Sequence, residues 1–149
     1  GNAHPNVVPY QTFPTQDGGV ILAIGNDGQY KRFCEAAGIP ACAADARFAS
    51  NPLRIANRDA CIAAIAPVMK NKTTAEWIAL LEPLGVPCGP IHRLDEVFTN
   101  PQIQHRGMQV DVPHPLTGTV PLVANPIKYS RTPLDYDTPP PACEDYQLQ

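Results

Sequence analysis

Proline, more than any other residue, limits the folds that are open to this chain. The sequence holds 18 prolines in 149 residues, about 12%, where globular proteins average roughly 5%. Proline fixes φ and lacks an amide donor, so it is disfavoured inside helices and central strands. Most of the prolines lie between apolar segments. We therefore expect many short helices and strands joined by defined turns.

The run Gly85–Ile91 combines two glycines and two prolines. It follows an amphipathic segment in which Thr73 and Glu76 have the spacing of a capping box. A buried stripe is predicted for this helix at Trp77, Leu80, Leu81 and Leu84. Gly85 then ends the helix as a left-handed residue, and a short kinked extended segment follows.

Two β-hairpins are predicted, one near each end of the chain. The first joins residues 10–15 to 20–24, and the second joins 108–112 to 119–123. Residues 20–24 form an apolar run, the other three segments alternate, and each hairpin has a turn that contains glycine. We expect the two hairpins to join in one antiparallel sheet.

The helices are predicted between the hairpins. One covers residues 29–37, with a cap at Asn26 or Asp27 and an end at Gly38. A longer helix over 50–70 has an apolar face that includes Ile55 and Ala56 and a kink at Pro67.

The order of strands, helices and strands predicts an α+β fold: a small antiparallel sheet from two hairpins with a cluster of short helices. We expect one small domain over residues 1–132 and a proline-rich extended tail over 133–149.

Composition excludes several function classes. A net charge of −3 gives no general attraction to nucleic acid or anionic membranes. No apolar run approaches the ~20 residues of a membrane span, and no signal peptide is visible. The five cysteines form no CxxC pair, so we predict reduced thiols in a cytoplasmic protein and no metal site.

The residues alone supply no catalytic constellation. The loop Gly25–Gly28 stands where phosphate-binding loops occur, but plain helix capping explains it better. Arg54 and Arg58 lie four residues apart, so they form an anion clamp, a solvated face or a helix–helix ion pair. Three histidines are interpreted as exposed or structural: His92, His105 and His114. His4 is rated higher, because its proline-flanked lead-in has no visible structural task.

An ordered series of motifs resembles the family III CoA-transferases, also called the CaiB/BaiF family, over nearly all of the chain. The series is Gly1–Pro5, Pro9–Phe13, Ile24–Tyr30, Asp45–Phe48, Asn57–Arg58, Thr74–Trp77, Gly85–Ile91, Glu96–Phe98, His105–Gly107 and Pro126–Ser130.

The resemblance implies a small domain that is normally inserted in a larger, Rossmann-like domain. The family's catalytic aspartate and most contacts to coenzyme A, the substrate, lie upstream of this chain. The segment Gly1–His4 resembles the one that covers the family's active site, so Gly1, Asn2 and His4 are candidate rim residues. No catalytic residue and no bound cofactor are expected here. The family's large domain and a second subunit of a homodimer are the implied partners.

Three interpretations stay open. The chain is part of a CoA-transferase that moves CoA from an acyl-CoA to a carboxylic acid, part of an α-methylacyl-CoA racemase, or a stand-alone binding or oligomerising module. The family's tail motif is altered here to Ala142–Asp145, which favours a fragment or the module. Whether the chain is an enzyme is left uncertain, and by itself we predict it to be inactive.

Overall fold

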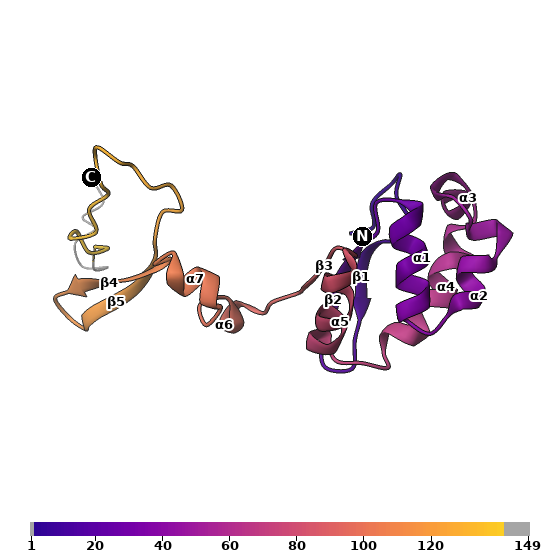
Figure 1. Ribbon diagram of the computed structural model, residues 1–149. Helices are drawn as coiled ribbons and strands as arrows, with labels where there is room; N and C mark the ends of the chain where they lie inside the picture. Colours follow the sequence, from indigo (N-terminus) through magenta and orange to yellow (C-terminus); the bar gives the residue numbers. More distant parts are fainter. Residues whose placement is uncertain (1, 142–149) are drawn as a thin grey trace, which may run out of the picture. The chain divides into compact units, whose positions relative to one another are not determined.

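The computed structural model describes residues 2–141 (Figure 1). The chain divides into two compact units, Gly1–Ile91 and His92–Gln149, which are treated separately below. The elements confirm the α+β class, with short helices and antiparallel strands. The small domain over 1–132 stays a prediction, and part of the predicted tail lies outside the described residues.

The sheet of the first unit has three antiparallel strands in the order β1-β2-β3. β1 (Tyr10–Pro14) and β2 (Gly19–Ala23) form the predicted hairpin. β3 (Cys88–Pro90) pairs with the other edge of β2, so that Gly89 faces Ile21. The expectation that both hairpins share one sheet is therefore wrong: the third strand comes from the Gly85–Ile91 run.

The first helix, α1 (Asp27–Ala36), follows the prediction closely. The Asn26 side chain accepts a hydrogen bond from Gln29 N and caps the helix, and Gly38 follows it with a φ of 73°. Two short elements come next, α2 (Pro40–Ala44) and a 3-10 turn, η1 (Ala46–Phe48).

The long helix predicted over 50–70 is two helices, α3 (Asn51–Ala56) and α4 (Arg58–Met69). The break lies at Asn57, where φ is −117° and ψ is 34°. Its side chain donates to Leu53 O at 2.9 Å, and such local bonds compete with the helical backbone pattern. Pro67 lies in the last turn of α4 and does not divide it. The fully buried side chains of these two helices are Arg54, Cys61, Ile65 and Met69. Of the predicted apolar face, Ile55 is partly buried and packs against the core.

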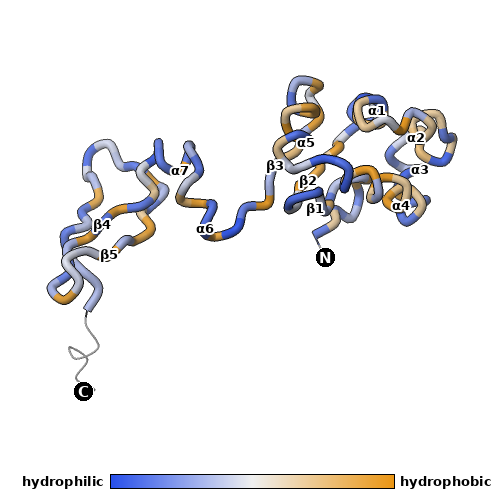
Figure 2. The backbone as a smooth tube through the Cα atoms, turned by 90° about the horizontal axis from the view of Figure 1, so that it is seen from below, coloured by the Kyte–Doolittle hydropathy of each residue, from blue (hydrophilic) through white to orange (hydrophobic). Residues whose placement is uncertain are grey.

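α5 (Thr74–Leu81) has the predicted capping box of Thr73 and Glu76. The 3-10 turn η2 (Glu82–Leu84) extends it, and Gly85 ends it with a φ of 64°. Trp77 is fully buried and donates from Nε1 to Met69 O at 2.8 Å. Figure 2 shows how strongly apolar residues gather in α4 and α5. The core of this unit is Val8, Phe13, Val20, Leu22, Ile24, Tyr30, Phe33, Cys34, Phe48, Cys61, Ile65, Met69, Trp77, Leu81 and Val86.

The second unit begins with two short helices, α6 (Leu94–Val97) and α7 (Pro101–His105). The second predicted hairpin follows as β4 (Gln109–His114) and β5 (Gly118–Val123), which form a separate two-stranded sheet. Residues 124–141 contain no regular element. Within residues 2–141, no helix is both long and apolar enough to cross a bilayer.

Candidate functional site

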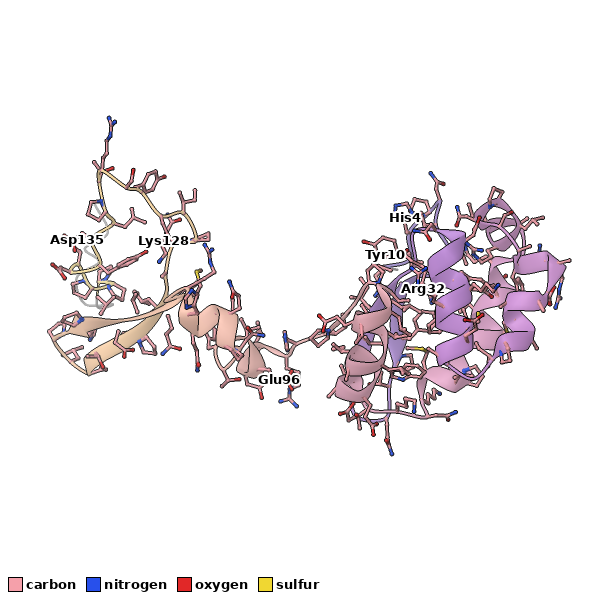
Figure 3. All side chains as sticks on the ribbon, viewed as in Figure 1. His4, Tyr10, Arg32, Glu96, Lys128 and Asp135 are labelled. Atoms are coloured by element: carbon pink, nitrogen blue, oxygen red, sulfur yellow. The ribbon has the colours of Figure 1, made fainter. Side chains whose placement is uncertain are left out.

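The segment before the first strand, residues 2–9, is called the lead-in. His4 N donates to Tyr10 O at 2.9 Å. The His4 ring stacks on the Tyr10 ring, with centroids 5.2 Å apart and planes 16° from parallel (Figure 3). The Asn2 side chain bonds both the hydroxyl and the amide of Thr12. The lead-in thus follows β1 closely and has the structural task that the sequence did not reveal.

Two side chains from α3 and α4 hold the middle of the lead-in. Asn51 donates to Asn6 O at 2.9 Å and accepts from Val8 N at 3.1 Å. Arg58 donates from Nη2 to His4 O at 3.0 Å and to Pro5 O at 2.7 Å. The lead-in backbone is therefore fixed by side chains that lie more than 40 residues away in the sequence.

Arg54 holds the end of the lead-in from inside the core, where its exposure is 0%. Its guanidinium donates to Val8 O at 2.7 Å and to Phe48 O at 2.9 Å. Nη2 pairs with Asp27 Oδ1 at 2.8 Å, and the group lies 4.4 Å from the centre of the Tyr30 ring. Of the three interpretations of Arg54 and Arg58, the helix–helix ion pair is confirmed for Arg54. Arg58 bonds backbone carbonyls.

The loop Gly25–Gly28 is a helix cap, as the sequence favoured. Gln29 reaches back to accept from Gly25 N at 2.8 Å and donates to Gly85 O at 3.2 Å. Arg32, one turn further along α1, donates to Leu84 O at 2.8 Å (Figure 3). The first turns of α1 therefore hold the Gly85 turn as well as the Arg54 ion pair.

Of the three rim candidates, the structure describes two. Asn2 is exposed and His4 is half-buried, both lie in the lead-in, and Gly1 lies outside the described residues. His4 Nδ1 accepts from Asn6 N at 3.1 Å. Asn2 also lines an open depression of about 390 Å³, together with Phe13 and Ile91. This depression is shallow and uncharged, so its lining offers contact area but no acid or base.

The sequence profile of CoA-transferase family III matches residues 1–146. The chain belongs to this family.

Named relatives agree with that assignment. The chain is 41% identical to succinate–glutarate CoA-transferase of Agrobacterium fabrum, over all of this chain and 37% of that protein. It is 33% identical to human succinyl-CoA:glutarate CoA-transferase, over 95% of this chain and 32% of that one. A crystal structure of a CaiB/BaiF family protein from Brucella suis is similar with a TM-score of 0.86 and 41% identity, over 95% of this chain and 36% of that one. The chain thus spans about a third of the length of these relatives.

The remaining histidines of this family III chain lie in the second unit. His92 Nδ1 is 3.9 Å from Glu96 Oε2, and His114 Nδ1 accepts from Leu116 N at 3.3 Å. His105 is exposed in the last turn of α7. Among residues 2–141, no three histidine, cysteine or acidic side chains converge as metal ligands.

The thiols of the first unit are poor nucleophiles. Burial raises the pKa of Cys34 to about 11, and burial also raises the pKa of Cys42, Cys61 and Cys88. A thiol with a raised pKa stays protonated near neutral pH, and the thiolate is the reactive form. Cys143 lies outside the described residues.

Sequence reasoning missed that three side chains, Asn51, Arg54 and Arg58, hold the lead-in. Their partners are backbone carbonyls and amides far away in sequence, which leave no periodic signal. The one available signal was the resemblance, whose motifs include both the lead-in and Asn57–Arg58.

Proposed function

We propose that this chain is part of a CoA-transferase that moves CoA from an acyl-CoA thioester to a carboxylic acid. The observation that carries the proposal is the family match over residues 1–146, together with relatives named as transferases of CoA between succinate and glutarate. Those names favour transfer over racemisation.

In this proposal the lead-in forms one wall of the substrate site, and Asn2 and His4 stand at its rim. Its support is the fixed backbone: Asn51, Arg54 and Arg58 bond it at five atoms between His4 and Val8. Substrate sites require groups held within a fraction of an ångström, and a backbone bonded in this way meets that requirement.

The chemistry itself belongs to the whole protein. Coenzyme A is the proposed substrate of that protein, and residues 1–149 supply a wall, with no catalytic carboxylate of their own. The proposed partners are the family's large domain and a second copy of the subunit. The cytoplasmic location stays a prediction.

The test is transfer of CoA from succinyl-CoA to glutarate, followed by separation of the two thioesters. The full-length polypeptide that carries residues 1–149 is expected to catalyse the transfer. Residues 1–149 alone are expected to give no product above the buffer blank. A full-length protein that transfers CoA to no carboxylic acid would contradict the proposal.

A second candidate, a non-catalytic binding or oligomerising module, is favoured by one observation. The second unit exposes several large apolar side chains, led by Leu94 at 85% and Leu116 at 75%. Exposed apolar surface of this kind is typical of an interface. Sedimentation of residues 1–149 tests this candidate, because a strictly monomeric species at high concentration would argue against it.

A further inference from the structure

His4 is one of the two candidate rim residues that the structure describes, and both its backbone and its ring are restrained. Its ring lies flat on Tyr10, its amide bonds Tyr10 O, and its carbonyl accepts from Arg58. Ring, amide and carbonyl are thus all restrained. No partner of His4 Nε2 is recorded among residues 2–141.

The hydrogen bond at Nδ1 decides which nitrogen carries the proton. Asn6 N is a donor, so Nδ1 must present a lone pair to it at 3.1 Å. In a neutral imidazole the other nitrogen then carries the hydrogen. Nε2–H of His4 is therefore a hydrogen-bond donor whose direction is set by the stacked ring.

The substrates of the proposed reaction need such a donor. A thioester presents a carbonyl oxygen and a carboxylate presents two oxygens, all of which accept hydrogen bonds. The other rim candidate that the structure describes is Asn2. Its side-chain amide already donates to the Thr12 hydroxyl and accepts from Thr12 N. Nη2 of Arg58 is likewise engaged by two lead-in carbonyls.

We infer that His4 binds substrate through Nε2–H, as a neutral donor to an oxygen of the carboxylate or the thioester, and that Arg58 is a positioning residue for it. This inference rests on the proposed function and gives one rim residue a defined role. The donor is preorganised, because Asn51, Arg54 and Arg58 hold the backbone on both sides of Pro5 before substrate arrives.

Three substitutions in the full-length protein separate the possible roles of the ring. His4→Phe keeps the stack on Tyr10 and removes both nitrogens. His4→Asn keeps an acceptor near Nδ1 for Asn6 N–H and lacks the outer donor. His4→Gln places an amide N–H near the position of Nε2 and does not stack.

The readout is kcat and KM for transfer of CoA from succinyl-CoA to glutarate. Loss of a hydrogen bond to a charged or strongly polarised oxygen is expected to lower kcat/KM roughly 10- to 100-fold for His4→Phe and His4→Asn. His4→Gln is expected to stay within about fivefold of wild type. If His4→Phe keeps the wild-type kcat/KM, the ring acts through packing and the inference is overturned. The inference is also overturned if His4→Gln is no better than His4→Phe, because an amide N–H near Nε2 then restores nothing.

The positioning role of Arg58 has its own readout. Arg58→Met keeps the aliphatic stem and releases two carbonyls, so hydrogen exchange in the lead-in should accelerate while kcat/KM falls. Arg47→Met is the matched control, since Arg47 pairs with Asp45 and has no recorded lead-in contact among residues 2–141. Unchanged exchange in Arg58→Met overturns this part.

Failure of the inference and failure of the proposed function give different results. If wild type transfers CoA and the His4 variants do not follow the expected order, only the inference fails. If wild type transfers no CoA, the proposed function fails and the substrate contact fails with it. In either case, the ¹⁵N shifts of selectively labelled histidine report the tautomer of His4. The His4 signal is assigned by its loss in His4→Gln. A proton on Nδ1 near pH 7 overturns the inference.

Discussion

The two units of this chain differ in how many apolar side chains they bury. The first unit gathers a contiguous core around Trp77, Phe33 and Leu22, all with 0% exposure. In the second unit, the buried apolar residues that the structure describes are Val112 and Ala124. Its exposed apolar side chains are Leu94, Leu116, Val123, Ile127, Tyr129 and Leu134.

This difference shows which unit carries its own stability. Burial of apolar surface is the main favourable term in folding, and the first unit has enough of it for a cooperative core. A lone two-stranded hairpin is marginal in water, and β4–β5 is such a hairpin. Among the described residues, the second unit therefore has little apolar burial of its own to stabilise it.

The substitution expected to have the largest effect on this contrast is Trp77→Ala. Removing a fully buried indole is expected to cost about 3–5 kcal/mol of unfolding free energy, because the cavity at the centre of the first unit cannot be refilled. Urea unfolding followed by circular dichroism measures the change. Leu116→Ala in the second unit is the control and is expected to cost less than about 0.5 kcal/mol. Equal losses for the two variants would contradict the contrast.

A smaller loss is expected for Arg54→Met. The change leaves Val8 O and Phe48 O inside the protein without their donor, at about 2–4 kcal/mol in total. Trp77 is the single tryptophan of the chain, so its fluorescence follows unfolding of the first unit alone.

Arg47→Met is the matched control for Arg54→Met. Its side chain is 60% exposed, and exposed ion pairs contribute about 0–1 kcal/mol. If both variants unfold at the same urea concentration, the buried arginine does not stabilise the first unit in the way described.

The local signals in the sequence were reliable where neighbouring residues decide the structure. Asn26, the Thr73–Glu76 capping box and Gly85 form caps whose partners lie within a few residues. Both hairpins likewise follow from apolar or alternating segments around a turn. These elements could be predicted because their hydrogen bonds are short-range.

The misplaced features depend on long-range contacts. β3 exists because Cys88 and Gly89 meet β2 across more than 60 residues, and a three-residue strand has no periodicity to read. For Arg54 the sequence left an anion clamp, a solvated face and a helix–helix ion pair open, and it did not predict burial, because a helical arginine usually lies in water. Its burial follows from the Val8, Phe48 and Asp27 oxygens that surround it, which no local pattern indicates.

Thr73→Ala tests a cap that was predictable from the sequence. The hydroxyl accepts from Glu76 N at 3.2 Å, and loss of such a cap costs about 1 kcal/mol. Fluorescence-monitored urea unfolding is expected to show this decrease, while Thr73→Ser keeps the hydroxyl and the wild-type midpoint. A Thr73→Ala midpoint equal to that of wild type would show that the cap does not contribute.

The smallest effect expected is the acid sensitivity of the same helix end. The amide of Thr74 donates to Asp17 at 2.8 Å and lowers the pKa of that carboxyl. The amide of Thr73 does the same to the pKa of Glu76.

A carboxyl whose pKa is lower in the folded state stabilises the fold above its unfolded pKa. That contribution is lost as pH falls through the folded value, and unfolded carboxyls titrate near pH 4. The urea midpoint of the first unit should thus fall between about pH 4 and pH 2.5.

The variant Asp17→Asn isolates one of the two carboxyls. At pH 7 it should unfold at a lower urea concentration than wild type, because the charged acceptor of Thr74 N–H is gone. Towards pH 2.5 the two midpoints should converge, since wild-type Asp17 is then protonated as well. If the difference between the two urea midpoints stays constant across this range, the negative charge of Asp17 does not stabilise the fold. The cap of α5 would then act through Thr73 alone.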